Sequence, residues 1–299
     1  MAASLRPLTA ERFRQPVVSS PSMRLRAGWN SDGRTLLHTA GAALMAATRW
    51  PSVLWIVRHG ESAGNVARDA AHAAGLDRID IVGRDVDVPL SKLGEEQADA
   101  LGRWFATGHE NGRPEVLLSS PYLRALATAH RFRDAGGAGP DEPICCDERL
   151  REKEFGILDG LTTGGVAFSY PEQANFRHVL GKFYHRPPGG ESWCDVIFRL
   201  RSLMDTVSLH YAGRRVMIIA HQVVVLCLRY VLENLNEAQI LAIDRSGDVA
   251  NCSITEYRFD PTVGRDGNLV LVRYNVTAPM EEADAAITAA PDPMVAARG

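Results

Sequence analysis

The first residues that could do chemistry lie at the end of an apolar run. Residues 53–57 read Val-Leu-Trp-Ile-Val and lead directly to Arg58, His59 and Gly60. An apolar run of this length, rich in β-branched and aromatic residues and bounded by a turn signal, predicts a buried strand. A strand that ends in Arg-His-Gly places a guanidinium and an imidazole at the rim of a sheet. Such a pair could bind an anion and attack it.

Two further junctions between a strand and a helix carry residues of the same kind. His221 follows the apolar run 216–220, and Arg124 lies one turn into a helix that begins after the run 115–120. In open α/β sheets the ligand site lies beyond the carboxyl ends of the strands, so the three junctions should meet at one edge. Arg binds phosphate oxygens bidentately, His can hold a phosphoryl group covalently, and helix N-termini add N–H donors. The pattern predicts an anion pocket that contains a nucleophile.

Transfer of a phosphoryl group from an ester also requires a proton donor for the leaving oxygen. Glu152 lies in the stretch L-R-E-K-E-F-G, directly after a short strand expected at 144–147, and Glu154 lies in the same stretch. A carboxyl group among phosphate charges has a raised pKa, which suits a general acid. The L-R-E register favours Glu152, and Glu154 remains the alternative.

The elements that must position these residues alternate between strands and helices. This alternation predicts an α/β fold: a three-layer, doubly wound, mostly parallel sheet flanked by helices. Residues 161–190 show no clear period and are rich in Lys, Arg, His, Pro and Gly, which indicates a loop or small cap inserted over the C-terminal strand edge. We expect a partly disordered N-terminal extension at 1–50, a catalytic domain at 51–276 and a disordered tail at 277–299.

The composition limits the classes of function. The chain has 299 residues, 45% of them apolar, and a net charge of −3, which gives no reason to expect nucleic acid or an acidic membrane as partner. No apolar run approaches the roughly 18 to 20 residues of a membrane helix. Five Cys without C-x-x-C spacing favour reduced thiols in a cytoplasmic protein, although an Arg-rich, acid-poor N-terminus leaves an organelle-targeting leader as an alternative.

Four sequence blocks, in order, resemble the histidine phosphatase (phosphoglycerate mutase-like) superfamily between residues 52 and 274. They are R-H-G-E-S-x-x-N from Arg58, S-x-x-x-R-A from Ser120, L-R-E-x-x-F-G from Leu150, and G-E-S followed by a helix and I-I-A-H ending at His221. The resemblance implies that His59 is the phosphorylated nucleophile and that Glu152 is the proton donor and then the base. It also implies no metal and no cofactor. The implied phosphoryl-binding groups are Arg58, Arg124 and His221, with Ser62 and Asn65 as neighbours of the phosphate.

The sequence departs from the most frequent family pattern around the second His. Where the family often has G-H-G, this chain has Ala220-His221-Gln222, which is similar to the fructose-2,6-bisphosphatase branch, as is P-P-G-G-E-S at 187–192. We therefore expect Gln222 to contact substrate. The Trp and the F-T-G-W stretch usual in the mutase branch are missing. The resemblance thus favours a metal-independent phosphatase that hydrolyses a small phosphomonoester, with a phosphoglycerate mutase-type transfer as the alternative.

The basic residues within 161–190 could recognise a second anionic group on the substrate. Arg186 is the candidate we single out, although a solvated basic face explains the same residues slightly better. A non-catalytic phosphate-binding module is a further alternative. We expect a small phosphorylated substrate as partner, and a homodimer is compatible with the sequence. The basic residues considered are Arg177, His178, Lys182, His185 and Arg186.

Overall fold

The computed structural model describes residues 49–108 and 111–290. The chain divides into a unit at Met1–Ala43 and a unit at Leu44–Gly299, and all the described residues belong to the second. The expectations for residues 1–48 and 291–299 lie outside the described residues.

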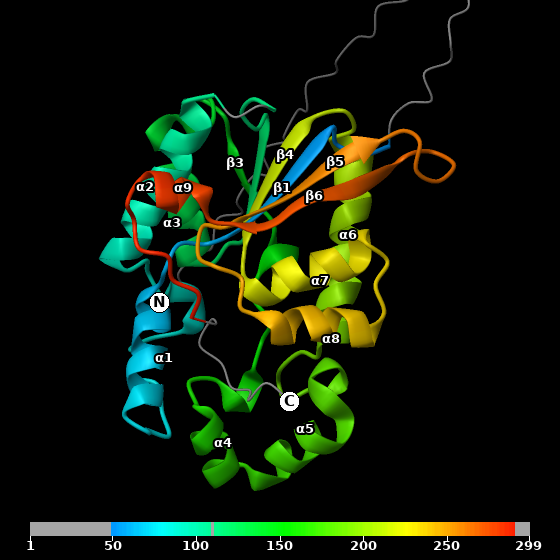
Figure 1. The fold of residues 1–299 in the computed structure, drawn as a ribbon. Coiled ribbons are helices and arrows are strands. Elements are labelled where there is room, and N and C mark those ends of the chain that lie inside the picture. The colour runs from blue at the N-terminus through cyan, green and yellow to red at the C-terminus, as the bar shows by residue number, and fades with distance from the viewer. Residues whose placement is uncertain (1–48, 109–110, 291–299) are drawn as a thin grey trace, which may run out of the picture. The chain divides into compact units, whose positions relative to one another are not determined.

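The described residues form a six-stranded mixed sheet in the order β3-β2-β4-β1-β5-β6 (Figure 1). Strands β3, β2, β4 and β1 run parallel, and β5 and β6 are antiparallel to their neighbours. The predicted α/β fold with a mostly parallel sheet is confirmed. The strands are β1 (Val53–Arg58), β2 (Val116–Ser119), β3 (Ile144–Cys146), β4 (Arg215–Ala220), β5 (Ile254–Asp260) and β6 (Asn268–Val276).

The strand register brings the chemical residues to one edge of the sheet. Arg58 pairs with Ala220, so β1 and β4 end at the same level, and His59 and His221 follow side by side. Ser119 pairs with Ile219, which places the end of β2 at that level as well. The backbone N–H of His59 donates to the carbonyl of Ala220 at 2.9 Å and continues the ladder past the last paired residue.

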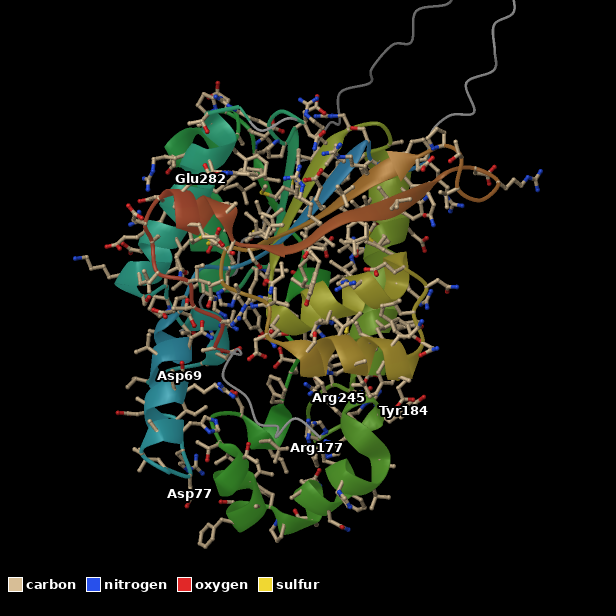
Figure 2. All side chains as sticks on the ribbon, viewed as in Figure 1. Asp69, Asp77, Arg177, Tyr184, Arg245 and Glu282 are labelled. Atoms are coloured by element: carbon tan, nitrogen blue, oxygen red, sulfur yellow. The ribbon has the colours of Figure 1, made fainter. Side chains whose placement is uncertain are left out.

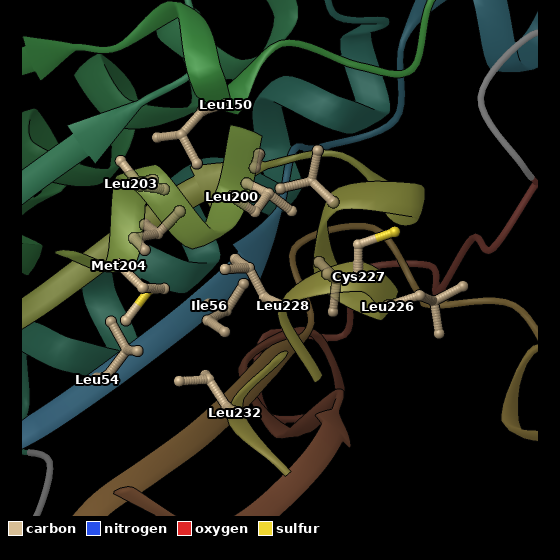
Figure 3. Close-up of a cluster of buried hydrophobic side chains, with 14 of the residues drawn as sticks. Leu54, Ile56, Leu150, Leu200, Leu203, Met204, Leu226, Cys227, Leu228 and Leu232 are labelled. Carbon is tan, nitrogen blue, oxygen red and sulfur yellow. The ribbon is translucent and has the colours of Figure 1, made fainter. Parts of the chain in front are cut away.

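Side chains alternate along β1 between two separate apolar clusters, as the period of a strand requires. Leu54 and Ile56 face α6 (Trp193–His210), α7 (Gln222–Leu232) and α8 (Glu237–Ser246), and Figure 3 shows part of this cluster. Trp55 and Val57 face the other way, toward α2 (Lys92–Ala106) and α3 (Leu123–Phe132). Burial on both faces explains why the strands are uninterrupted apolar runs. Among the described residues, no helix is long and apolar enough to cross a membrane.

Residues 161–190, which we call the cap, contain two helices that the sequence analysis did not anticipate. These are α4 (Thr163–Ser169) and α5 (Pro171–Tyr184), and α5 is interrupted at Gly181, which has a φ of 77°. The cap has its own small apolar cluster, Leu158, Leu161 and Val166. Only a few apolar positions face this cluster, so no helical period stands out in the sequence.

The prediction of a disordered tail is wrong for residues 277–290. A short helix, α9 (Ala278–Glu282), follows β6, and its Met280 is fully buried against the α2 side of the sheet. The following residues then return to the carboxyl edge of the sheet: the side chain of Gln97 donates to the carbonyl of Ala286, and Thr288 exchanges hydrogen bonds with Asn251. One buried methionine among Ala, Asp and Glu gives little sequence signal for this docking.

The remaining elements are short, except for α1. Helix α1 begins after Ser62, whose side chain forms a capping box with Asn65. The elements are α1 (Ala63–Ala73), η1 (Asp85–Asp87), η2 (Arg133–Gly137), η3 (Glu148–Leu150) and η4 (Gly156–Leu158).

Candidate active site

His59 is fully buried directly after β1, and its ring is held in one orientation. Its Nδ1 lies 2.6 Å from the carbonyl oxygen of Gly60, and this contact assigns the proton to Nδ1. The lone pair is then on Nε2, which accepts a hydrogen bond from Nε of Arg124 at 3.3 Å. The nitrogen that could attack phosphorus therefore points at a buried guanidinium.

Gly60 is required by the close approach of two backbone segments. A Cβ added at Gly60 would lie 2.4 Å from the carbonyl oxygen of Gly94, so no larger residue fits without a shift. The backbone N–H of Gly60 donates to Thr128 of α3 at 3.1 Å. The carbonyl of His59 accepts from the side chain of Asn251 at 3.0 Å. The backbone on both sides of the His59 ring is thus fixed by contacts distant in sequence.

Arg124 presents its guanidinium as a fork to a carboxylate from η1. Its two terminal nitrogens donate to the two carboxylate oxygens of Asp85 at 3.0 and 3.1 Å, and Nη1 also donates to the Asp85 carbonyl at 2.7 Å. Arg124 is fully buried, whereas the side chain of Asp85 is 21% exposed. This is the planar, bidentate geometry with which Arg binds phosphate oxygens.

The guanidinium of Arg58 also donates hydrogen bonds, in its case to backbone carbonyl oxygens. Its Nη1 donates to the carbonyl of Val249 at 2.6 Å, and its Nη2 donates to the carbonyl of Ala290. The side-chain amide of Asn65 donates to the same Ala290 oxygen at 3.2 Å. Arg58 and Asn65 therefore share one acceptor, and Ser62 is linked to Asn65 by the capping box.

His221 completes the group at the end of β4, where it occupies the N-cap position of α7. Its ring centroid lies 5.1 Å from that of His59, and its Nε2 is 2.8 Å from the hydroxyl oxygen of Ser120. The structure thus brings together His59, Arg58, Arg124 and His221, all fully buried. Gln222, the next residue, donates from its side chain to Asp248 at 2.8 Å.

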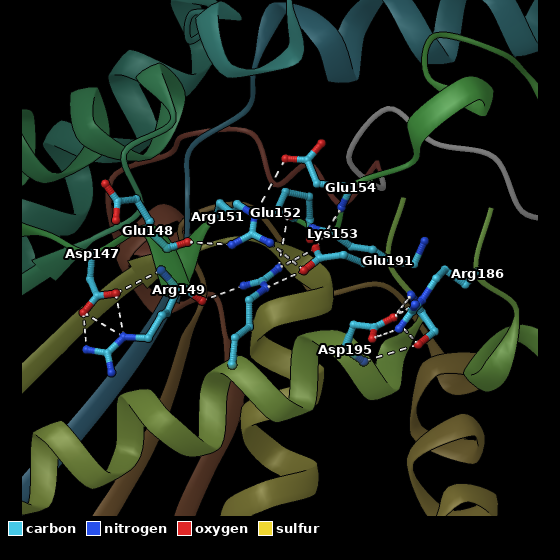
Figure 4. A network of polar contacts seen from close by, with 12 residues as sticks. Asp147, Glu148, Arg149, Arg151, Glu152, Lys153, Glu154, Arg186, Glu191 and Asp195 are labelled. Atoms are coloured by element: carbon cyan, nitrogen blue, oxygen red, sulfur yellow. Dashed lines mark hydrogen bonds and ion pairs between the residues drawn. The ribbon is translucent and has the colours of Figure 1, made fainter. Parts of the chain in front are cut away.

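The two candidate proton donors differ in environment (Figure 4). Glu152 is buried and accepts a hydrogen bond from the backbone N–H of Lys153 at 2.7 Å. The Glu154 side chain is 46% exposed and accepts from the hydroxyl of Tyr122 at 2.7 Å. Burial, followed by the bond to Glu154, raises the pKa of Tyr122, so this phenol stays protonated as the donor. Both carboxyl groups remain candidates, and burial favours Glu152 for a water-excluded reaction.

Arg186 is not among the residues that the structure gathers around His59. Its side chain is 62% exposed and forms an ion pair with Asp195 in the first turn of α6.

Three parts of the site were not predicted from the sequence. They are Asp85, Tyr122 and residues 286–290, which return to the carboxyl edge of the sheet. Tyr122 packs edge-on against His221 with ring centroids 5.1 Å apart. The position of Tyr122, two residues before Arg124, could have indicated that it belongs to the site. The sequence around Asp85 and around residues 286–290 gave no such signal.

A family model for the histidine phosphatase superfamily (branch 1) matches residues 54–276. The chain belongs to this superfamily. The match covers the described sheet except for Val53, and it includes His59 and the three buried residues around it, which places the protein among phosphoryl-transfer enzymes.

Curated relatives of this superfamily member include mutases and phosphatases. A 2,3-bisphosphoglycerate-dependent phosphoglycerate mutase of Sinorhizobium fredii is 31% identical over 195 residues, which cover 64% of this chain and 84% of the mutase. The fructose-2,6-bisphosphatase TIGAR of Xenopus tropicalis is 35% identical over 152 residues, which cover 51% of this chain and 48% of the relative.

Solved structures agree on the fold. YhfR of Bacillus stearothermophilus superposes with a TM-score of 0.58 at 26% identity and covers 76% of this chain and 98% of its own. The mycobacterial glucosyl-3-phosphoglycerate phosphatase Rv2419c, solved with inorganic phosphate, has a TM-score of 0.56 at 24% identity and covers 76% of this chain and 99% of its own. The second likeness shows the shared fold alone.

Proposed function

We propose that the protein is a metal-independent phosphatase that hydrolyses a small phosphomonoester through a phosphohistidine on His59. One observation carries the proposal. The Nδ1 atom of His59 lies 2.6 Å from the Gly60 carbonyl, which leaves Nε2 facing the buried guanidinium of Arg124. A buried imidazole with a fixed tautomer and a cation beside its lone pair is arranged to attack an anion that the cation binds.

In the first step, Nε2 of His59 attacks the phosphorus of the ester. Arg58, Arg124 and His221 hold the phosphoryl oxygens and neutralise their charge, which supplies most of the rate. The bond from phosphorus to the ester oxygen breaks, and Glu152 gives its proton to that oxygen. The hydrogen bond from Nδ1 to the Gly60 carbonyl stabilises the positive ring of the phosphohistidine.

In the second step, water cleaves the phosphohistidine. The Glu152 carboxylate takes a proton from water as its oxygen attacks phosphorus, and the bond from phosphorus to Nε2 breaks. Inorganic phosphate leaves, and both His59 and Glu152 return to their starting protonation states. Binding of the phosphoryl group to Arg124 requires Asp85 to give up the two terminal nitrogens that it holds.

A mutase is the second candidate, because two relatives that match over more than 80% of their own length are phosphoglycerate mutases. In a mutase the phosphohistidine would return its phosphoryl group to a phosphorylated metabolite instead of to water. The sequence Ala220-His221-Gln222 and the lack of the mutase-type stretches favour hydrolysis.

The deciding experiment is a screen of phosphorylated metabolites in the presence of EDTA, with vanadate as inhibitor. We expect release of inorganic phosphate that EDTA leaves unchanged and vanadate suppresses. A rate that depends on added bisphosphate, with isomerised product in place of free phosphate, would support the mutase instead. Loss of activity in EDTA would reject metal independence.

A further inference from the structure

The backbone N–H and C=O groups of residues 59–61 all have hydrogen-bond partners among the described residues. Two of these partners are fully buried side-chain amides from distant elements. The side chain of Asn251 donates to the carbonyl of His59 at 3.0 Å, and the side chain of Gln97 on α2 accepts from the N–H of Glu61 at 2.8 Å. Because a peptide unit is planar, the bond to this N–H also fixes the preceding carbonyl, which contacts the His59 ring.

The hydroxyl of Thr288 joins these two amides. Its oxygen accepts a hydrogen bond from Nε2 of Gln97 at 2.9 Å, and it donates to Oδ1 of Asn251 at 3.1 Å. The backbone N–H of Asn251 also donates to the Thr288 carbonyl at 2.8 Å. These three side chains, which we call the bridge, connect the backbone of Glu61 with that of His59 through hydrogen bonds of ordinary length.

The direction of each hydrogen bond in the bridge requires a hydroxyl at position 288. Gln97 presents its oxygen to a backbone N–H, so its NH2 group faces Thr288. Asn251 presents its NH2 group to a backbone carbonyl, so its oxygen faces Thr288. A hydroxyl can accept from the first amide and donate to the second at the same time, whereas a methyl group can do neither. The hydroxyl thus fixes the orientation of both amides.

Thr288 lies outside the region that the family model matches, which ends at residue 276. The C-terminal segment that carries it is docked on the body of the protein before it reaches the bridge. Met280 of α9 is fully buried, and Glu282, labelled in Figure 2, accepts a hydrogen bond from the Trp104 side chain of α2 at 3.1 Å. These contacts hold the segment against α2, the helix that supplies the glutamine of the bridge.

We propose that Thr288 is a positioning residue for the attack by His59, which makes the C-terminal segment a part of the active site. The proposal rests on the proposed function for the role of His59. With the hydroxyl in place, the two amides hold the peptide units on either side of Gly60, and Nε2 of the ring keeps its direction toward Arg124. Without the hydroxyl, either amide can rotate and present the wrong atom to the backbone. None of the bridge side chains is among the groups proposed to bind the phosphoryl group, so loss of the hydroxyl should lower kcat and leave KM nearly unchanged.

The kinetic test compares Thr288→Val, which removes the hydroxyl, with Thr288→Ser, which keeps it. Thr277→Val is the matched control, because the Thr277 hydroxyl lies in the same segment but donates to Glu281 of α9. Thr288 is only partly buried, so the variants should fold, and Tm checks that they do. On p-nitrophenyl phosphate we expect Thr288→Val to lower kcat about tenfold or more with less than about a twofold change in KM, because a small displacement of a reacting atom is costly.

Thr288→Ser and Thr277→Val should keep the wild-type kcat, because both retain the hydroxyl of the bridge. A loss in Thr288→Ser as large as that in Thr288→Val would overturn the proposal, since the hydroxyl would then not be the cause. A rise in KM with unchanged kcat in Thr288→Val would also overturn it.

The tautomer of the His59 ring gives a readout that a purely structural role of Thr288 would leave unchanged. In protein with isotope-labelled histidine, long-range proton–nitrogen NMR spectra show which ring nitrogen carries the proton, and His59→Gln identifies the signals. With the ring neutral, we expect the wild type to be protonated on Nδ1, as its contact with the Gly60 carbonyl assigns, and Thr288→Val to show a mixture of both tautomers. An unchanged ring signal in Thr288→Val would overturn the positioning role, whatever the change in Tm. The measurement requires no turnover, so it tests the bridge even if the protein hydrolyses no compound in the panel, an outcome that would reject the phosphatase alone.

Discussion

Around His59 the polar side chains are fully buried and hold one another or the backbone, whereas Arg177 of the cap is only partly buried, and its enclosed Nη2 has no hydrogen-bond acceptor among the described residues. The first region is built at strand ends, where the sheet register fixes each residue. The second is built from a loop and an interrupted helix. The difference indicates a division of labour. In the proposed function, the strand edge would hold the phosphoryl group, and the cap would contact the rest of the substrate.

The largest expected effect comes from the strand edge. His59→Ala should reduce kcat by about 10⁴-fold or more, because the covalent step is lost altogether. Turnover with a chromogenic phosphomonoester, at matched protein folding by circular dichroism, measures it. Substantial activity in this variant would contradict the catalytic role of His59, and with it the assignment of the chemical step to the strand edge.

The proton-donor loop lies between the two regions, and its two carboxyl groups can be separated. Glu152→Gln should lower kcat by about 10²-fold or more on an alkyl phosphate, because the poor leaving group then departs without a proton. The loss should be much smaller on p-nitrophenyl phosphate, whose leaving group needs little protonation. Glu154→Gln is the matched control. If it shows the larger and leaving-group-dependent loss, Glu154 is the donor.

Asp85 binds both terminal nitrogens of Arg124, so replacing Asp85 should make this guanidinium more available to an anion. Asp85→Asn should lower KM or the inhibition constant of vanadate by about five- to tenfold, because the neutral side chain competes less well for the guanidinium. Asp87→Asn, on the exposed neighbour that pairs with Arg84, is the control. A higher KM would mean that Asp85 orients Arg124 for the substrate.

The smallest effect is expected for Arg186, the cap residue that sequence reasoning singled out. Its exposed ion pair with Asp195 is screened by solvent, so Arg186→Met should change KM by less than about twofold on every substrate. A selective increase for substrates with two anions would instead support the sequence-based hypothesis that Arg186 recognises a second anionic group.

The strands, and the gathering of His59, Arg58, Arg124 and His221 at one edge of the sheet, could be predicted from sequence because their signals are local. β1 and β4 are buried on both faces and therefore read as apolar runs, and their last residues are followed at once by His59 and His221. Arg58 and Arg124 stand next to such junctions. The parallel orientation of these strands follows from their alternation with helices, whereas their order in the sheet does not follow from the sequence.

Other parts of the site depend on contacts between residues far apart in the chain. Asp85 reaches Arg124 across 39 positions, and Ala290 reaches Arg58 across 232. Neither contact leaves a period, a cap or a turn signal in the sequence around it. The burial of Lys153 is a similar case, because a lysine beside two glutamates resembles a solvated charge in the sequence.

The central claim is that His59 carries the phosphoryl group, and trapping the intermediate tests it most directly. The protein is mixed with a radiolabelled phosphomonoester, quenched in base within one turnover, and digested for mass spectrometry. We predict label that is stable in base and labile in acid, located on the peptide that contains His59 and lost in His59→Ala. Label on another residue, or full turnover by the wild type with no label at any quench time, would contradict the account.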